Sequence, residues 1–483
     1  MGLFGILLGL ALLVWLAYRG WSILLLAPGA ALIAAGFAGG PLLAYWTQTF
    51  MDSASRFIAQ FFPLFLLGAL FGKLMEDSGS VAAIASFMTE KLGQQRAVLT
   101  VVLAGALVTY GGVSLFVAFF VLVPMAQALF RTAAIPNRLI PATVALGTST
   151  FTMSALPGTP AIQNAIPMPF FGTTPLAAPG LGVIASAIML AFGLWWLRHA
   201  ETAARRNGEG FGGAPVPVDE AAEDERVRQR ATTAHEFDPP EVHHGHPSRE
   251  APPIGLAALP LLVVVSVNVL MTLVVLPSLD VSFLAEERFG ATSLSAVGGV
   301  WAVVTALAAA IVTVIAINRG RLQGLRDTMD SGANASVLPV LSVASLVGFG
   351  AVVAAVPAFA IVRNWVLSIG GGPLVSLAVA TNLLSALTGS ASGGLTIALD
   401  ALGSTYMRLA AAHGIDPSLL HRIAVMSAGT LDSLPQNGAV VTLLSVCGAT
   451  HRQSYFDIVM AAIVGPIIAL AVVLVLGTFL GSF

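Results

Sequence analysis

The chain has 483 residues, of which 57% are hydrophobic and 10% are charged, and its formal net charge is -2. Soluble domains carry about 25% charged residues, so this composition excludes an ordinary water-soluble protein. The near-neutral charge, without a stripe of basic residues, gives no sign of a nucleic-acid partner and leaves the lipid bilayer as the expected surroundings.

Long apolar runs recur from one end of the chain to the other. The first, at residues 3–18, lacks a basic start and a small-residue cleavage site, so we predict a membrane helix there rather than a signal peptide. Later runs at residues 260–276, 297–317 and 458–480 each have about the 20 residues that a spanning helix needs. Since none shows the short alternation of a barrel strand, we predict an all-α polytopic membrane protein with about 10–14 membrane segments.

Charged and titratable residues are rare inside these runs. Lys73, Glu76 and Asp77 follow an apolar stretch, and we interpret them as a charge cluster close to a loop rather than as a proton relay. Three histidines are expected at the ends of segments, namely His413, His421 and His451.

Four clusters rich in Gly, Pro, Ser, Thr and Asn interrupt the apolar segments, at residues 110–114, 147–164, 388–394 and 427–438. Hydrocarbon tolerates irregular backbone only where protein or a water-filled cavity satisfies its polar groups. Broken helices also expose N-terminal N–H groups, which attract carboxylates. The clusters therefore favour an anion site, with close helix packing as the alternative role of their small residues.

The clusters come in two pairs, which suggests an internal duplication. Residues 109–116 correspond to residues 388–395, and residues 154–158 correspond to residues 432–436, in the same order and at a similar offset. Duplicated halves, often of inverted topology, are the usual construction of secondary transporters. We predict an N-terminal repeat over residues 1–197, a linker over 198–253 and a C-terminal repeat over 254–483.

The linker is polar and is expected to be disordered. Its histidines at 243, 244 and 246 could bind a metal ion, but a solvated loop is the favoured interpretation because no second set of ligands accompanies them. Basic residues follow the run at 297–317, so by the positive-inside rule that loop and the linker two spans earlier face the cytoplasm. These basic residues are Arg319, Arg321 and Arg326.

Asp432 is the most informative single residue, because it lies between apolar stretches within residues 427–438. A carboxylate at membrane depth is costly and is usually functional. Burial disfavours the charged form of a carboxyl group, so Asp432 could take up and release a proton. The alternative is a carboxylate at the end of a loop that caps a helix.

Motifs of other classes are missing. The sequence has no phosphate loop ending in Gly-Lys-Ser/Thr, no His-Glu-x-x-His pair and no Gly-x-Ser-x-Gly turn. Cys447 is the single cysteine, which excludes an internal disulfide and a cysteine-based metal cluster. We therefore expect no enzyme activity, no cofactor and no bound metal ion.

Residues 432–440, followed by residues 450–455, resemble the gluconate permease (GntP) family, and so do residues 78–85 and 388–394. The likeness looks closest to the hydroxybutyrate permease branch and extends over nearly the whole chain except the linker. It implies a proton symporter of the bacterial inner membrane for gluconate, other aldonates or short hydroxy acids. It also implies the architecture of the ion transporter superfamily, with two inverted repeats that each carry a re-entrant hairpin and a broken helix.

The same resemblance, together with the polar clusters, gives a set of expected site residues. Gln436 stands where the family pattern has a histidine after Leu-Pro, so we assign the coupling proton to Asp432. We expect the substrate carboxylate to bind backbone N–H and hydroxyl groups at the hairpin tips, and the substrate hydroxyls to bind amide side chains. The first set comprises Gly112, Ser114, Thr388, Ser390, Ser392 and Asn437, and the second comprises Gln163, Asn164 and Gln436.

Several alternatives stay open at this point. A sodium-coupled carboxylate transporter is the nearest one, followed by a passive anion channel and, more remotely, a membrane-embedded enzyme. The partners implied are a small organic anion, protons and lipid. Related architectures commonly form homodimers, but this sequence leaves the oligomeric state open.

Overall fold

The computed structural model describes residues 1–18, 21–92, 96–113, 115–211, 248, 250–435 and 437–483, and contains no strand among them. Six helical segments are long and apolar enough to cross a membrane, and five shorter apolar helices accompany them. The six are Leu42–Asp77, Pro179–Arg206, Ile254–Ser278, Leu294–Ile317, Leu325–Ala355 and His451–Leu480. The predicted all-α polytopic membrane fold is thereby confirmed.

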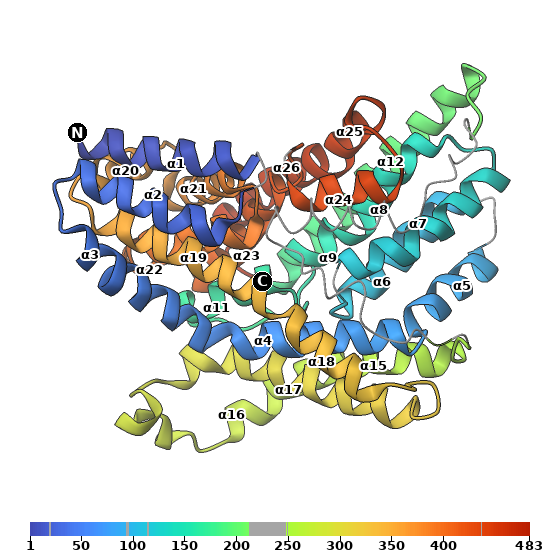
Figure 1. Cartoon of the computed structure of the whole chain (residues 1–483), viewed down its shortest axis with the longest axis horizontal. Helices are drawn as coiled ribbons and strands as arrows, with labels where there is room; N and C mark the ends of the chain where they lie inside the picture. Colours follow the sequence, from blue (N-terminus) through green and yellow to red (C-terminus); the bar gives the residue numbers. More distant parts are fainter. Residues whose placement is uncertain (19–20, 93–95, 114, 212–247, 249, 436) are drawn as a thin grey trace.

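The helices form three groups that Figure 1 separates. The group on the left contains the N-terminal helices and part of the second half, and α1 packs against α2 as expected of a membrane helix. Its members are α1 (Gly2–Tyr18), α2 (Ile23–Phe37), α3 (Leu42–Ala44), η1 (Tyr45–Phe50), α19 (Val337–Ala355), α20 (Phe359–Leu367), α21 (Gly372–Thr388), α22 (Ala391–His413) and α23 (Pro417–Thr430).

The group on the right contains most of the first half together with the C-terminal helices. Its longer members are α5 (Ser80–Leu92), α6 (Ala97–Tyr110), α7 (Leu115–Thr132), α8 (Ile140–Thr148), α12 (Pro179–Arg206), α24 (Gly438–Val446), α25 (His451–Val459), η7 (Met460–Val464) and α26 (Gly465–Leu480). Three short helices belong to the connections of the first half: η3 (Asn137–Leu139), α9 (Phe151–Ser154) and α10 (Ile162–Ala165). A fourth, α11 (Pro167–Phe171), lies on the left in Figure 1 and packs against α17, α22 and α23.

The third group lies along the lower edge in Figure 1 and is built on the long helix α4. Helices α17 and α18 pack against α4, and α15 packs against α17. The members are α4 (Met51–Asp77), α15 (Ile254–Leu270), η4 (Met271–Val275), α16 (Leu276–Ser278), η5 (Ser282–Ala285), η6 (Glu287–Phe289), α17 (Leu294–Ile317) and α18 (Leu325–Ala335).

The chain leaves helical geometry at all four polar clusters. One break separates α6 from α7, and a second spans the short helices α9 and α10. The third break, residues 389–390, separates α21 from α22, and the fourth, with described residues 431–435 and 437, separates α23 from α24. The pairs α6–α7 and α21–α22 lie in different groups (Figure 1), and the division into two repeats stays a prediction. Their inverted relationship stays a prediction.

The hairpin of α21 and α22 depends on a close approach at Gly394. A Cβ atom placed there would lie 2.3 Å from both the Cα and the N atom of Ser385. We expect Gly394→Ala to push the two helices apart and to lower the stability of the protein by about 1–3 kcal/mol, as overpacking does in other cores. Thermal unfolding of the purified protein in detergent measures this loss.

Gly29→Ala is the matched control for this substitution. Gly29 also lies inside a helix, α2, but a Cβ atom there would meet no atom within 4 Å. The control should unfold at the temperature of the wild type or slightly higher, since alanine favours helix more than glycine does. Equal melting temperatures for Gly394→Ala and Gly29→Ala would contradict the close packing described for this hairpin.

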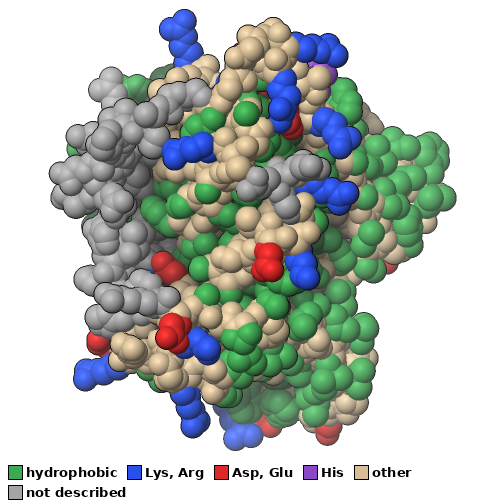
Figure 2. Space-filling model, turned by 90° about the vertical axis from the view of Figure 1, so that its right-hand side faces the viewer, with side chains coloured by type: hydrophobic (Ala, Val, Ile, Leu, Met, Phe, Trp, Pro, Cys, Tyr) green, Lys and Arg blue, Asp and Glu red, His purple; other side chains and the backbone are tan. Residues whose placement is uncertain are grey.

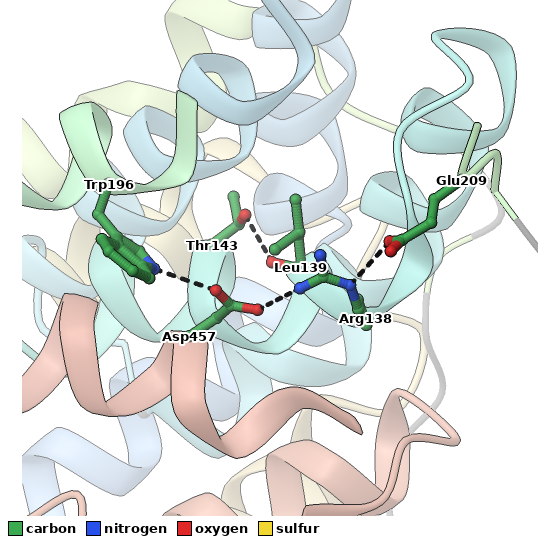
Figure 3. A network of polar contacts seen from close by, with 6 residues as sticks. All are labelled: Arg138, Leu139, Thr143, Trp196, Glu209 and Asp457. Atoms are coloured by element: carbon green, nitrogen blue, oxygen red, sulfur yellow. Dashed lines mark hydrogen bonds and ion pairs between the residues drawn. The ribbon is translucent and has the colours of Figure 1, made fainter. Parts of the chain in front are cut away.

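A polar network joins the end of α12 to α25 and to the segment before α8 (Figure 3). Asp457 accepts a hydrogen bond from Trp196 Nε1 at 3.0 Å and an ion pair from Arg138 Nη1 at 2.7 Å. Arg138 Nε also lies 3.2 Å from a carboxylate oxygen of Glu209. Three segments far apart in the sequence are thus held together at this end of the molecule.

The same end carries many basic side chains, as Figure 2 shows, with hydrophobic surface beside them. The last turn of α12 contributes Arg205 and Arg206. By the positive-inside rule this end should face the cytoplasm. Helix α12 continues to Arg206, past the boundary expected at residue 197. Most of the predicted linker, with His243, His244 and His246, lies outside the described residues, so the division into repeats and linker stays a prediction.

Candidate functional site

A cavity of about 200 Å³ lies where three of the four breaks converge. Its walls come from α4, from the two breaks of the first half, from the junction of α18 and α19, and from the start of α22. The lining residues are Leu64, Phe65, Gly68, Ala69, Thr109, Gly112, Val113, Leu115, Met153, Pro160, Ala161, Ile162, Gln163, Ala335, Ser336, Pro339, Val343 and Ser392. Three residues predicted from the sequence therefore meet here, namely Gly112, Gln163 and Ser392.

The first break reaches the cavity through Gly112. Its φ of 97° lies in the left-handed region, which side chains rarely adopt, and a Cβ atom there would lie 3.0 Å from Pro160. Beside it, the hydroxyl of Tyr110 donates a hydrogen bond of 2.9 Å to the carbonyl oxygen of Pro157. The first and second breaks are therefore fixed against each other, and glycine at 112 permits the contact.

Gln163 is the amide side chain that best fits a ligand-binding role. It lies in α10, is 9% exposed, and lines the cavity. Its side chain has no hydrogen bond to another described residue. Because the side chain lines the cavity, its amide is available for a polar ligand or for water there.

The second half reaches the cavity at the beginning of α22. Ser392 lines the cavity, and the preceding Ser390 caps the helix by accepting a hydrogen bond of 3.2 Å from Gly393 N. Thr388 donates to the carbonyl oxygen of Ser390 at 3.1 Å and so fixes the turn between α21 and α22. Of the predicted residues in this turn, Ser392 alone lines the cavity, while Thr388 and Ser390 shape the turn behind it.

Asp432 joins the third break to the fourth. Its Oδ1 accepts hydrogen bonds from the backbone N–H of Ala391 at 2.7 Å and from Asn437 Nδ2 at 2.8 Å. Asn437 Nδ2 also lies 2.8 Å from the carbonyl oxygen of Gly389, and its Oδ1 accepts from Ala439 N at 2.7 Å. A carboxylate oxygen therefore occupies the N-terminus of α22, next to cavity residue Ser392. This contact has the geometry of a helix cap, the alternative that the sequence left open for Asp432.

Asn164 lies beside Gln163 but its side chain is committed elsewhere. Its Nδ2 donates to the carbonyl oxygens of Thr159 and Pro175, both at 3.0 Å, and its Oδ1 lies 3.1 Å from His421 Nε2. These contacts assign the proton of the imidazole to Nε2, so that His421 Nδ1 accepts from the hydroxyl of Thr173 at 2.6 Å. The role of Asn164 in binding stays a prediction, and its visible role is to hold α23 against the second break.

Two neighbouring residues on α23 correct the sequence analysis. His421, which was expected at the end of a segment, is completely buried, and so is Arg422. Arg422 donates to the carbonyl oxygen of Ala177 through Nε and Nη2, at 3.1 and 2.7 Å, and to that of Ala155 through Nη1 at 3.1 Å. The sequence did carry a signal for this buried anchor, namely an arginine among the apolar residues 417–430, since charges inside membrane segments are rare and mark important positions.

The charge cluster expected close to a loop does lie at the end of α4, directly before the turn at residues 78–79, but it is buried. The side chains of Lys73 and Asp77 are 3% and 0% exposed, and Thr328 of α18 donates a hydrogen bond to Asp77. Two further predicted residues, Ser114 and Gln436, lie outside the described residues. Within the described part of the chain, no group of three or more His, Cys, Asp or Glu side chains could hold a metal ion.

The fold and the cavity define a class of protein. A multi-pass helical membrane protein whose broken helices line a small cavity is typical of membrane transporters. The computed structure resembles a solved structure from the study titled "Structure and Function of Neisseria gonorrhoeae MtrF Illuminates a Class of Antimetabolite Efflux Pumps", with a TM-score of 0.55 over 90% of this chain and 85% of that chain. At 13% identity, this likeness concerns the fold alone.

Sequence comparison identifies the family. The family model described as GntP family permease matches residues 1–191. A Bacillus subtilis (strain 168) protein named "Uncharacterized transporter YxjC" is 40% identical over 482 residues, which cover 97% of each chain. The chain belongs to the GntP permease family and is a membrane transporter, in keeping with the predicted bacterial inner membrane.

Proposed function

We propose that this transporter takes up a small hydroxy-monocarboxylate together with protons, by alternating access. The carrying observation is the cavity in which Gly112 and Gln163 of the first half face Ser392 of the second half. A ligand between two halves can be exposed to one side of the membrane or the other as the halves move against each other. The family resemblance supports gluconate, another aldonate or 3-hydroxybutyrate as the substrate.

The lining of the cavity favours the shorter of these acids. Its polar side chains are Thr109, Gln163, Ser336 and Ser392. Thr109 and Ser336 already donate to carbonyl oxygens of Gly105 and Ala333, at 2.8 and 2.7 Å. A sugar acid such as gluconate would leave several hydroxyls without partners in such surroundings, at about 1–3 kcal/mol for each. We therefore propose 3-hydroxybutyrate or a similar short acid.

Asp432 is the proposed carrier of the coupled proton. As a carboxylate it accepts the N–H of Ala391 at the start of α22. This position is favourable for any anion, because the positive end of the helix dipole lies there. Protonation of Asp432 weakens it as an acceptor and makes the helix terminus available to the carboxylate of the substrate. Proton and substrate would then bind together, as symport requires.

Ligand-induced stabilisation tests the site. A ligand that binds the folded form alone raises the melting temperature, so 3-hydroxybutyrate should raise that of the purified wild type more than gluconate does. Gln163→Leu should weaken the binding of 3-hydroxybutyrate by roughly 5- to 150-fold, the equivalent of one hydrogen bond of about 1–3 kcal/mol. Titration of the ligand in the thermal-shift assay gives both affinities.

The matched control is Gln48→Leu, which replaces an exposed glutamine of η1 far from the lining residues. It should bind 3-hydroxybutyrate like the wild type. A larger shift with gluconate would contradict the proposed substrate class, and unchanged binding by Gln163→Leu would contradict the cavity as the site.

A further inference from the structure

The far end of α4 carries a buried ionic cluster of Lys73, Glu76 and Asp77. Lys73 Nζ lies 3.0 Å from Glu76 Oε2 and 3.3 Å from Asp77 Oδ1. Asp77 Oδ2 accepts a hydrogen bond of 2.7 Å from the hydroxyl of Thr328 on α18. Asp77 Oδ1 faces the ammonium group but accepts no hydrogen bond of normal geometry, although it is fully buried.

The cluster has one cation for two carboxyl groups. Helices α17 and α19, which pack on α4, carry no charged residue. The charged side chains of the other described segments around α4 are exposed except for Arg321, between α17 and α18, which is half-buried and lies 3.4 Å from Asn318 Oδ1. The exposed ones are Arg326, Asp327 and Asp330 of α18, Glu90 and Lys91 of α5, Arg131 of α7, and Glu250. With both carboxyl groups ionised, the cluster would hold an uncompensated negative charge in a low-dielectric interior.

Such a charge is costly, by several kcal/mol even after the surroundings relax. A proton on one carboxyl group neutralises the extra charge and removes this cost, so no second cation is needed. Glu76 is 22% exposed, so a proton can reach the cluster from its side, while Asp77 is covered completely. The geometry therefore places the proton at the Glu76 side of the cluster.

The cluster is connected to the cavity by the two helices that hold it. Gly68 and Ala69 of α4 line the cavity, and Lys73 follows one turn later. Ala335 of α18 lines the cavity as well, while Thr328 of the same helix binds Asp77. Between these points the helices touch closely, since a Cβ atom on Gly332 would lie 3.0 Å from Leu70 Cα.

We propose that Lys73, Glu76 and Asp77 form a second proton site, and that its occupancy sets the packing of α4 against α18 and with it the cavity wall. The part of this inference that concerns transport rests on the proposed function. The existence of the proton site can be measured without any substrate. In the transport mechanism, this second proton site would make the cavity wall respond to protons independently of Asp432.

The substrate-free test is infrared spectroscopy of the purified protein at neutral pH. The wild type should show the absorption of a buried protonated carboxyl group, and Asp77→Asn or Glu76→Gln should lose it. Asp52→Asn, an exposed position on the same helix that pairs with Arg56, should keep it. An identical carboxylic-acid signal in all four proteins would overturn the proposal, and so would its loss from the wild type on addition of sodium ions, which would assign the site to sodium.

The transport test separates this site from the proposed function. In proteoliposomes, Glu76→Gln should still exchange labelled for unlabelled 3-hydroxybutyrate. Its uptake driven by a pH gradient should fall by about tenfold or more. Equal gradient-driven uptake by Glu76→Gln and Asp52→Asn would overturn the coupling role. If the wild type itself fails to transport, the proposed function fails while the infrared result stands. If Asp77→Asn does not fold, the triple variant Lys73→Met, Glu76→Gln and Asp77→Asn replaces it. It keeps no ionisable group in the cluster, so it must lose the signal.

Discussion

Asp432→Asn is expected to lower pH-gradient-driven uptake by about 100-fold or more, the scale of losing a proton-transferring group. An asparagine oxygen can still accept the hydrogen bonds that Asp432 Oδ1 receives from Ala391 N and Asn437 Nδ2. The hairpin should therefore stay intact while the protonatable group is lost. Uptake of labelled 3-hydroxybutyrate into proteoliposomes with an acidic exterior measures the effect.

The control for this variant is Asp280→Asn, in the exposed loop before α17, which should transport like the wild type. Exchange of labelled for unlabelled substrate across the membrane should also continue in Asp432→Asn, because exchange needs no net movement of protons. Undiminished gradient-driven uptake by Asp432→Asn would show that this carboxyl group caps a helix and carries no proton.

Arg422→Met is expected to be the most destabilising substitution in the protein. Arg422 is completely buried and donates to the carbonyl oxygens of Ala155, inside the second break, and Ala177, just before α12. Its removal leaves two buried carbonyl groups without these donors, at a cost of about 1–3 kcal/mol for each. We expect a loss of roughly 2–6 kcal/mol and little folded protein, measured as yield and thermal unfolding in detergent.

Arg408→Met provides the comparison, since Arg408 is an exposed arginine on α22 whose hydrogen bond goes to the neighbouring Thr405. It should unfold close to the wild type. Arg422→Lys should lie between the two, because an ammonium group keeps the charge but cannot span both carbonyl oxygens with the fork of a guanidinium. A melting temperature for Arg422→Met equal to that of Arg408→Met would contradict the anchoring role.

The parts of the fold that were predictable depend on local patterns. Apolar runs of spanning length predicted helices, and the runs at 297–317 and 458–480 correspond to α17 and to the continuous segment from α25 to α26. Clusters of Gly, Pro and Ser predicted the breaks, since these residues disturb a helix wherever it lies. The inverted relationship of the halves was not accessible in this way, because orientation depends on how separate helices pack.

The residues of the site likewise divide into those that local patterns predicted and those that they did not. Gly112, Gln163 and Ser392 were identified because each lies in a break, and all three line the cavity. The walls from α4, α18 and α19 were missed, since nothing local in residues 64–69 or 335–343 distinguishes a cavity face from any other apolar face. The spacing of Lys73, Glu76 and Asp77 at i, i+3 and i+4 does suit one face of a helix, and this could have indicated that α4 continues through them.

The central claim is most directly tested by accumulation of labelled 3-hydroxybutyrate in proteoliposomes with an imposed inward pH gradient and no substrate gradient. We predict transient accumulation above the external concentration, its abolition by a protonophore, and no change when choline replaces sodium. Uptake that stops at equal concentrations inside and outside, or accumulation that requires sodium, would contradict a proton-coupled carrier.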